Sequence, residues 1–298
     1  MAGRVAIIGA GPAGLMAAEV LAERGIGVDI YDAMPSAARK FLMAGKSGLN
    51  ITHSEPLARF LSRYRCADPR LVDQVRTFGP DAIRAWMAGL GIKAVSGPSG
   101  RVFPEMMKAS PLLRAWLKRL SNAGARLQTR HRWQGWGEDG ALLFETPQGR
   151  VEARPVASIF ALGGASWSRL GSTGAWADLF TAEGLNVQPF GPNNCGFLHD
   201  WSAHMLERFA GAPVKSVAVS TRHGGQTWRA RGEFVITSRG VESGSIYALS
   251  APLNGQLAET GAAHLVLDLL PDLPADEVAR RLARPRAKQS LASFLRKT

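Results

Sequence analysis

The chain has 298 residues, a length that suits two domains better than one. Hydrophobic residues make up 46% of it and charged residues 20%, a globular composition that excludes a chain disordered throughout. The net charge of +12 comes from Lys and Arg residues spread along the sequence, so we expect solvated surfaces and no nucleic-acid partner.

Cysteine usage and hydropathy narrow the class further. The two cysteines, Cys66 and Cys195, form no CxxC pair, which disfavours a zinc site or a dithiol redox centre, and we expect no metal. Two free thiols are typical of a reducing compartment. The sequence contains no run of about 20 uncharged apolar residues, so we expect no membrane span. We therefore expect a cytoplasmic protein with no membrane partner.

The first 32 residues have the pattern of a strand–helix–strand unit. Arg4–Ile8 is apolar and β-branched, and predicts a buried strand. Pro12–Arg24 predicts a helix, and Val28–Tyr31 predicts a second strand that ends at Asp32. Together they have the length of a βαβ unit, the building block of a parallel sheet.

The next segments alternate between loops, helices and strands. Residues 33–52 are rich in small residues, and we expect a long functional loop there. Helical patterns follow at Glu55–Tyr64, Pro69–Phe78, Pro80–Leu90 and Ser110–Gly124. We expect strands within residues 126–148 and at Val156–Leu162, where the first domain closes around its ligand.

The composition changes near Pro189 and Pro192, which predicts a boundary between a first domain at residues 1–188 and a second at 189–298. In the second domain we expect short strands and then helices. The strands are predicted at Val214–Ser220, Thr227–Arg231, Glu233–Thr237, Tyr247–Ala251 and His264–Leu269, and the helices at Ala275–Arg284 and from Ser290 onward.

The run from Gly9 to Gly14 is a GxGxxG motif between the first strand and the first helix. Gly9 permits the tight turn, Gly11 lets the backbone approach a pyrophosphate, and Gly14 lets the helix pack on the strand. The intervening Pro12 and Ala13 open the helix, whose N-terminus favours phosphate.

Asp32 stands where such a unit places the partner of a ribose hydroxyl. A carboxylate there accepts hydrogen bonds from a free 2′-hydroxyl and repels a 2′-phosphate. The motif therefore fits FAD or NAD and fits NADP poorly. By itself it does not separate FAD from NAD, although a glycine-rich segment after the acid is more typical of FAD enzymes.

Five segments, in this order, resemble the HI0933-like family of NAD(P)/FAD-dependent oxidoreductases, and most closely a subgroup of flavoproteins. The segments are Gly9–Gly14, Arg39–His53, Gly100–Pro104, Ala161–Ser166 with Gly171–Gly174, and Gly232–Thr237.

The resemblance implies an α/β protein: a Rossmann-like FAD-binding domain with an inserted domain, part β-barrel (about residues 189–272) and part helical (about 273–298). It also implies that the 40–52 segment lies near the flavin and that residues 163 and 164 lie beside the dinucleotide. In addition to the first motif and Asp32, the implied cofactor-binding residues are Arg39, Lys40, Gly45, Lys46, Ser47, Gly48, Asn50, Thr52, Gly163 and Gly164.

The chain departs from the family pattern in two places. Many members have a glycine run followed by Arg-Cys-Asn, where this chain has Lys46-Ser47-Gly48-Leu49-Asn50, so no role of that cysteine carries over. Members also continue past the position of Thr298 with a glycine-rich segment that holds the flavin. We therefore expect a fragment or a truncated protein, with weaker hold on the flavin.

No catalytic residue can be assigned from the sequence. His53 and His199 are weak candidates for proton donors, and Glu105 and Lys108 for groups facing the cleft. Two tryptophans, Trp167 and Trp176, flank the glycine turn at 171–174 and are candidates for stacking on a ring.

Three functions are compatible with these features. The first is an FAD-dependent oxidoreductase that uses NAD(P)H and a small-molecule substrate. Analogy with the family suggests reduction of a carbon–carbon double bond. The second is a truncated flavin-binding protein without turnover. The third is an RNA-modifying flavoprotein, suggested by the net charge alone.

Overall fold

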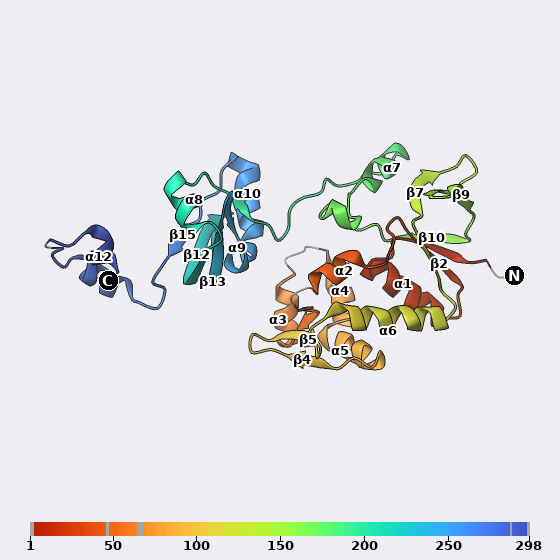
Figure 1. Cartoon of the computed structure of the whole chain (residues 1–298), viewed down its shortest axis with the longest axis horizontal. Coiled ribbons are helices and arrows are strands. Elements are labelled where there is room, and N and C mark those ends of the chain that lie inside the picture. Colours follow the sequence, from red (N-terminus) through yellow and green to blue (C-terminus); the bar gives the residue numbers. More distant parts are fainter. Residues whose placement is uncertain (1–2, 46–47, 65–67, 287, 297–298) are drawn as a thin grey trace. The chain divides into compact units, whose positions relative to one another are not determined.

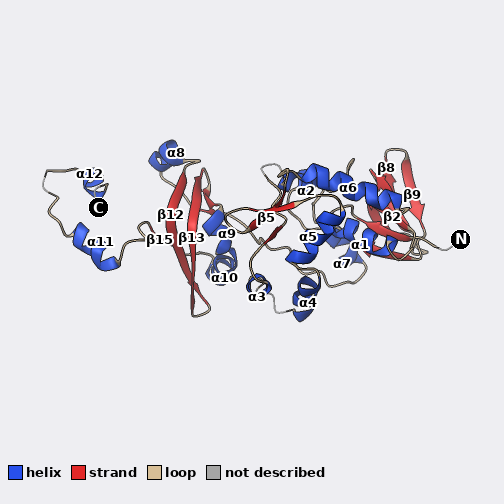
Figure 2. Cartoon of the chain, turned by 90° about the horizontal axis from the view of Figure 1, so that it is seen from below, coloured by secondary structure: helices blue, strands red, loops and turns tan. Residues whose placement is uncertain are grey.

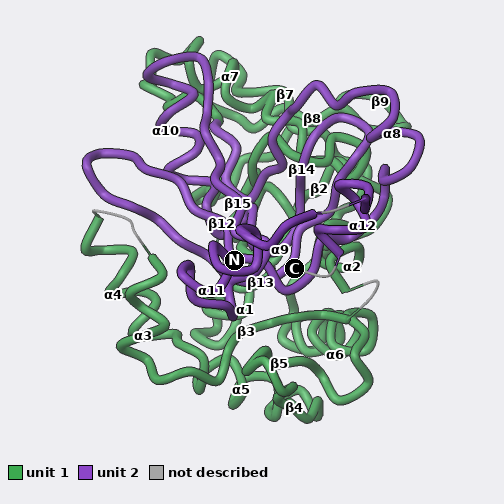
Figure 3. The backbone as a smooth tube through the Cα atoms, turned by 90° about the vertical axis from the view of Figure 1, so that its left-hand side faces the viewer, with its two compact units in different colours: residues 1–190 green, residues 191–298 purple. Residues whose placement is uncertain are grey.

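The structure is a computed structural model that describes residues 3–45, 48–64, 68–286 and 288–296. The chain divides into two compact units, Met1–Phe190 and Gly191–Thr298, coloured separately in Figure 3. In the described ranges, no helix is both long enough and apolar enough to cross a membrane.

A parallel four-stranded sheet forms the centre of unit 1 (Figure 1). Its order is β10-β1-β2-β6, with every neighbouring pair parallel. The strands are β1 (Val5–Ile8), β2 (Val28–Asp32), β6 (Arg126–Thr129) and β10 (Ala157–Phe160). All four residues of β1 are buried, as expected for an inner strand of a sheet that is covered on both faces.

The two faces of this sheet have different covers. Alternate residues such as Ile7 and Ile30 pack with α1 (Pro12–Ala22) and α6 (Ala109–Asn122). Ile8 and its neighbours face a three-stranded antiparallel meander, where they meet the buried Phe144. The meander strands are β7 (Arg132–Trp136), β8 (Leu142–Thr146) and β9 (Gly149–Ala153).

Behind the sheet, a buried carboxylate ties three helices together. Glu19 of α1 accepts hydrogen bonds from the indole Nε1 atoms of Trp86 and Trp116, at 3.0 and 2.5 Å. It also forms an ion pair with Arg119 at 2.6 Å. Because Glu19 is only 4% exposed, these three donors compensate the burial of its charge and fix α1 against α5 (Pro80–Gly89) and α6.

Residues 33–108 connect β2 to α6 and contain a small antiparallel sheet and short helices. The sheet order is β3-β5-β4. The elements are α2 (Arg39–Ala44), β3 (Thr52–His53), α3 (Leu57–Ser62), α4 (Pro69–Thr77), α5 (Pro80–Gly89), β4 (Ala94–Ser96) and β5 (Arg101–Pro104). Unit 1 ends with the short 3-10 helix η1 (Ser168–Leu170) and α7 (Trp176–Ala182).

Unit 2 is built on a five-stranded antiparallel sheet of order β11-β14-β13-β12-β15, in which β12 and β13 are the long strands (Figure 2). Its core contains Val219, Phe234 and Ile246. The strands are β11 (Phe197–Leu198), β12 (Pro213–His223), β13 (Gln226–Thr237), β14 (Gly240–Glu242) and β15 (Val266–Asp268). The helices are α8 (Ala203–Phe209), α9 (Gly244–Ala248), α10 (Ser250–Thr260), α11 (Ala275–Leu282) and α12 (Leu291–Leu295).

The predicted α/β class with a Rossmann-like parallel sheet is confirmed, and the strand–helix–strand start is observed with ends shifted by one or two residues. In unit 2 the five strands follow one another in an open order in the described residues, so closure of this region into a barrel stays a prediction.

Three parts of the predicted secondary structure were wrong. Residues 33–52 are not one loop, because α2 forms from good helix formers whose Phe41 and Leu42 pack on the core. Residues 247–251 are not a strand but the junction of α9 and α10. Ile246, Leu249 and Leu253 are buried there at helical spacing, which a short apolar run conceals.

A third correction concerns the strands predicted at 227–231 and 233–237. They are a single strand, β13, which continues through Gly232. Gly232 has φ +155°, and the register of the β12 partner shifts between Val214 and Val217. The glycine therefore marks a bulge within a strand, where the sequence suggested a turn.

Candidate functional site

The turn between β1 and α1 is held by backbone hydrogen bonds on both sides. The Gly9 N–H donates to the Tyr31 carbonyl at 2.7 Å, and the Ala10 carbonyl accepts from the Ala38 N–H at 2.9 Å. On the other side, the Ala161 N–H donates to the Ile8 carbonyl at 2.8 Å. The turn is therefore fixed to the segments that follow β2 and β10.

Each glycine of the motif has a different structural reason. Gly9 has φ +108°, and a Cβ there would lie 2.3 Å from the Ala161 carbonyl oxygen. A Cβ on Gly14 would lie 1.9 Å from the Gly9 carbonyl oxygen. Gly11 has an ordinary φ of −78°, and a Cβ there would meet no protein atom within 4 Å. Packing thus explains Gly9 and Gly14, whereas Gly11 borders open space.

Asp32 is held at the end of β2 by two N–H groups. Its Oδ2 accepts from Ala10 at 2.7 Å and its Oδ1 from Met34 at 2.8 Å. Burial raises the pKa of the Asp32 carboxyl above its ordinary value, and those two N–H groups and the charge of Arg39 oppose this effect. The carboxylate is fixed in place, and each oxygen keeps capacity to accept from a ligand.

A cavity of about 760 Å³ lies where the parallel strands end. We call it the sheet-edge cavity. It is bordered by the residues that follow β1, β2, β6 and β10, and by α2 and the N-terminus of α1. The chain adds β2 and β6 on one side of β1 and later places β10 on its other side, and ligands of open α/β sheets bind where the strand order reverses in this way.

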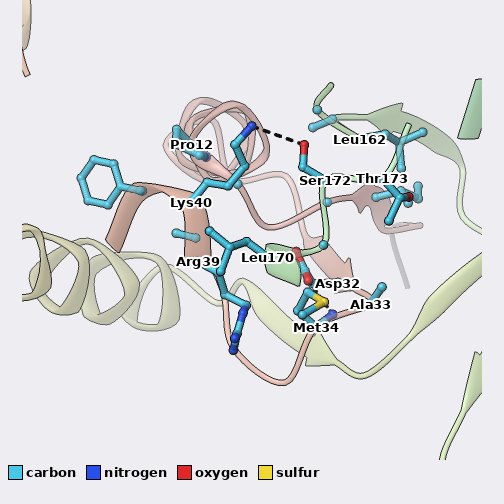
Figure 4. Close-up of a pocket in the computed structure, with 18 of the residues that line it drawn as sticks. Pro12, Asp32, Ala33, Met34, Arg39, Lys40, Leu162, Leu170, Ser172 and Thr173 are labelled. Atoms are coloured by element: carbon cyan, nitrogen blue, oxygen red, sulfur yellow. Dashed lines mark hydrogen bonds between the residues drawn. The ribbon is translucent and has the colours of Figure 1, made fainter. Parts of the chain in front are cut away.

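The lining of the cavity is mainly apolar and aromatic, with a few polar groups (Figure 4). Three lining residues carry positive charge and one carries negative charge, in the described part of the chain: Arg39, Lys40 and Arg132 against Asp32. The excess of positive charge favours an anionic ligand.

The wall opposite α2 is the segment 161–175, which we call the post-β10 loop. The buried Ser172 donates its hydroxyl to the Gly164 carbonyl at 2.8 Å. Trp176, at the start of α7, donates its indole N–H to the Gly163 carbonyl at 3.0 Å. Side chains from the end of the loop thus fix the backbone at its beginning.

Two N–H groups in the cavity lining, the Nε–H of Arg39 and the Nε1–H of Trp133, are buried and have no hydrogen-bond partner among the described residues. The open space at Gly11, these donors and the Asp32 acceptor form a set that suits a ligand with phosphate oxygens, ribose hydroxyls and a planar ring. The residues present therefore fit a dinucleotide.

About half of the predicted cofactor-binding residues line this cavity: Gly9, Gly11, Pro12, Asp32, Arg39, Lys40, Asn50 and Gly163. Six other predicted residues lie outside the lining, namely Ala13, Gly14, Gly45, Gly48, Thr52 and Gly164. Gly45, for example, abuts α6, where a Cβ would lie 2.5 Å from that of Ala109. Lys46 and Ser47 lie outside the described residues.

The candidate proton donors His53 and His199 do not line the cavity, and neither do Glu105 and Lys108. His53 contacts the Ser99 carbonyl and the Glu55 N–H, and Glu105 pairs with Lys93 on the surface. Lys108 precedes α6, and His199 of unit 2 packs its ring edge-on against Trp201. Of the two candidate tryptophans, Trp176 lines the cavity, whereas Trp167 is 64% exposed and does not.

Sequence reasoning missed Tyr31 of β2 and two further parts of the lining. The first part follows β6 and includes His131 and Gln134, and the second runs from the end of η1 and includes Leu170, Ser172 and Thr173. Only the sheet order brings these segments together. The glycine turn at 171–174 was the one sequence signal that pointed to the second group.

A parallel sheet with this glycine turn, and with an acid at the end of the second strand, defines a protein of the Rossmann-like class. The chain belongs to the HI0933-like family, since residues 3–251 match the family described as "HI0933-like protein Rossmann domain". No curated protein matches the chain.

Among solved structures, the chain is similar to the 3-ketosteroid-Δ4-(5α)-dehydrogenase of Rhodococcus jostii RHA1, with 13% identity over 54% of this chain and 46% of that one, at a TM-score of 0.42. It is similar to THI4 of Thermovibrio ammonificans, with 16% identity over 62% and 64% of the two chains and a TM-score of 0.40. It is also similar to a flavocytochrome c3 fumarate reductase, with 17% identity over 54% of this chain and 34% of that one, at a TM-score of 0.42. The chain spans less than two thirds of each, and none of these likenesses says what it does.

Proposed function

We propose that the chain is the cofactor-binding part of an FAD-dependent oxidoreductase that uses NAD(P)H as electron donor and a small molecule as substrate. The observation that carries this proposal is the fixed Asp32 carboxylate beside the glycine turn, in a cavity large enough for an extended ligand. A ribose hydroxyl can donate to this carboxylate while the adjoining phosphates meet the N-terminus of α1.

The extent of the lining favours FAD over NAD as the resident ligand. Beyond the glycine turn the lining continues along α2 to Phe41, Leu49 and Ile51. These apolar side chains suit a large flat ring that stays bound between turnovers. The polar Asn50 lies among them and can hydrogen-bond to ring oxygens or nitrogens.

FAD, when bound, would supply the hydride or electron transfer. The residues of the chain would supply position and environment. Asp32 would orient the ribose, the α1 N-terminus and the cationic lining would balance the phosphate charge, and the apolar lining would exclude water. The titratable side chains that line the cavity in the described residues are Tyr31, Asp32, Arg39, Lys40, His131 and Arg132, and assays with candidate substrates identify the reaction.

The proposal is tested by the absorbance spectrum of the purified chain before and after incubation with FAD. We expect flavin bands, one released FAD per chain on heating, and then NADH or NADPH oxidation in the presence of an electron acceptor. Asp32→Ala should lose most of the bound flavin. Glu105→Ala is the matched control, because it removes a surface carboxylate outside the cavity.

A chain that remains colourless, and whose folded state is not stabilised by added FAD, would contradict the proposal. Flavin retention without NAD(P)H oxidation would support FAD as the cofactor and exclude NAD(P)H as the electron donor. Equal flavin loss in both variants would show that the effect of Asp32→Ala is not a property of the site.

A further inference from the structure

The strand β15 forms an exposed edge of the sheet in unit 2. It is the last strand in the sheet order and pairs with β12 on one side (Figure 2). Its residues are apolar and yet open to solvent, since Val266 is 62% and Leu267 is 42% exposed. Edge strands of natural proteins usually carry Lys, Pro or a bulge that blocks further pairing, and residues 265–267 contain no Lys or Pro and lie in an uninterrupted register with β12. Such an edge is a template for another strand.

The backbone groups of Leu265 and Leu267 face the free side of this edge. The carbonyl of the preceding residue, His264, accepts from the Thr221 hydroxyl of β12 at 2.6 Å. The His264 N–H donates to the Gln256 side chain at 2.7 Å, and the same side chain donates to the next β12 carbonyl. The backbone of His264 is therefore directed toward β12. Because these groups alternate in direction along a strand, those of Leu265 and Leu267 are directed outward.

The side chains of the segment divide between the two faces of the sheet. Leu265 packs against the core of unit 2, so Leu267 shares that face. Val266 lies on the opposite face, together with His264 and Asp268. From either end the segment has the same order of chemistry: a polar residue, Leu, Val, Leu and a polar residue. It is therefore able to pair with a second copy of itself in antiparallel orientation.

One register of such a pair satisfies the backbone and the charges together. With Val266 opposite Val266 of the second copy, Leu265 lies opposite Leu267, and these are the residues whose backbone groups face outward. His264 then lies opposite Asp268. The Oδ1 atom of Asp268 accepts a local backbone N–H at 3.1 Å, which leaves Oδ2 to accept from an imidazole N–H. A register with Leu267 opposite itself would place Val266 opposite Asp268 and separate the two polar groups.

We propose that residues 264–268 are a self-association edge, through which two copies of the chain join their unit 2 sheets in antiparallel orientation. The pairing involves few residues, so the dimer is weak, with a dissociation constant of about 10–100 µM. Closure of unit 2 into a barrel within one chain would cover the same edge, so the two arrangements exclude each other. The inference concerns unit 2 alone and does not depend on the cofactor.

The test is sedimentation velocity of the full chain at concentrations from about 1 to 300 µM. Wild-type protein should change from monomer to dimer over this range. Val266→Lys should raise the dissociation constant at least about tenfold, because it places two like charges side by side at the centre of the pairing. Leu198→Lys is the matched control, since Leu198 is 76% exposed on β11, at the other edge of the same sheet. It should leave the dissociation constant unchanged.

Two further variants separate strand pairing from a general loss of apolar surface. Leu267→Pro removes an N–H that faces the free edge, so it should weaken the dimer about tenfold while the urea unfolding midpoint stays close to that of wild type. His264→Asp places two carboxylates opposite each other and should weaken the dimer by a similar factor. Adding Asp268→His to His264→Asp exchanges the two polar groups and should restore the dissociation constant to within about threefold of wild type.

The outcomes decide for or against the edge. Rescue by the double exchange would support the antiparallel register even if Val266→Lys proved insoluble. Wild-type protein that stays monomeric at every concentration would overturn the proposal and favour an edge covered within one chain. A dimer that Val266→Lys and Leu267→Pro leave unchanged would also overturn it, because the contact would then lie elsewhere. Binding of FAD in these variants reports on the proposed function separately.

Discussion

The glycine turn and the post-β10 loop border the same cavity, but the turn is held mainly by backbone hydrogen bonds and the loop by side chains. The turn is fixed by N–H and carbonyl groups at or beyond the ends of β2 and β10 and by the Asp32 carboxylate, and Gly9 and Gly14 are required there because a Cβ would collide with backbone. The loop is fixed by the hydroxyl of Ser172 and the indole of Trp176, which donate to carbonyls 8 and 13 residues earlier. The turn can therefore be predicted from glycine spacing, whereas no spacing motif indicates the side-chain contacts of the loop.

The largest effect should come from a methyl group inside the glycine turn. Gly14→Ala places a Cβ 1.9 Å from the Gly9 carbonyl oxygen, and backbone cannot move aside as a flexible side chain can. We expect a loss of more than about 4 kcal/mol in the free energy of unfolding, measured by urea denaturation, or loss of soluble protein.

Gly11→Ala is the matched variant in the same turn. Its Cβ meets no protein atom within 4 Å and its φ is ordinary, so the unfolding free energy should stay within about 1 kcal/mol of wild type. Nucleotide affinity should fall at least about tenfold, because the methyl occupies the space of the ligand. Unchanged affinity would show that this space is not used.

The next largest effect tests the buried network around Glu19 that fixes α1 against α5 and α6. Glu19→Gln removes the charge that Arg119 and two indoles share in a buried position. We expect a loss of about 2–3 kcal/mol in unfolding free energy, measured by the same denaturation. Glu23→Gln, on the exposed end of the same helix, should change it by less than about 0.5 kcal/mol. Equal losses would show that the network does not stabilise α1.

The comparison also explains how much the sequence could predict. The β1–α1–β2 unit followed from glycine spacing and apolar periodicity, because Gly14 and Asp32 interact with residues close in the chain or one crossover away. Ser172 could not be assigned, because Lys40 is 132 residues away in the chain and meets it only once β10 has paired with β1. Tyr31 and His131 come together for the same reason, through the pairing of β2 with β6.

A smaller effect concerns the pH dependence of Asp32. Burial raises the pKa of this carboxyl from 3.8, so the proton is retained to a higher pH than on an ordinary aspartate. Ribose hydroxyls donate to the ionised form, so ADP affinity should rise as pH increases through the raised pKa and weaken as pH falls through it. In calorimetry from about pH 4 to 7, Asp32→Asn should lose this component and bind about tenfold more weakly at neutral pH. A wild-type profile identical in shape to that of the variant would contradict the role of Asp32.

The smallest effect should come from the post-β10 loop, and it sharpens the contrast between the two walls. Trp176→Phe keeps the ring but removes the hydrogen bond to the Gly163 carbonyl, so the unfolding free energy should fall by only about 1 kcal/mol. Trp176 also packs edge-on against Phe180 and Phe190, and a phenyl ring can keep part of that contact. Because the loop remains fixed at Ser172, nucleotide affinity should fall only two- to threefold, or about 0.5 kcal/mol. A loss as large as that of Gly11→Ala would mean that the indole hydrogen bond, rather than the serine, sets the position of the loop.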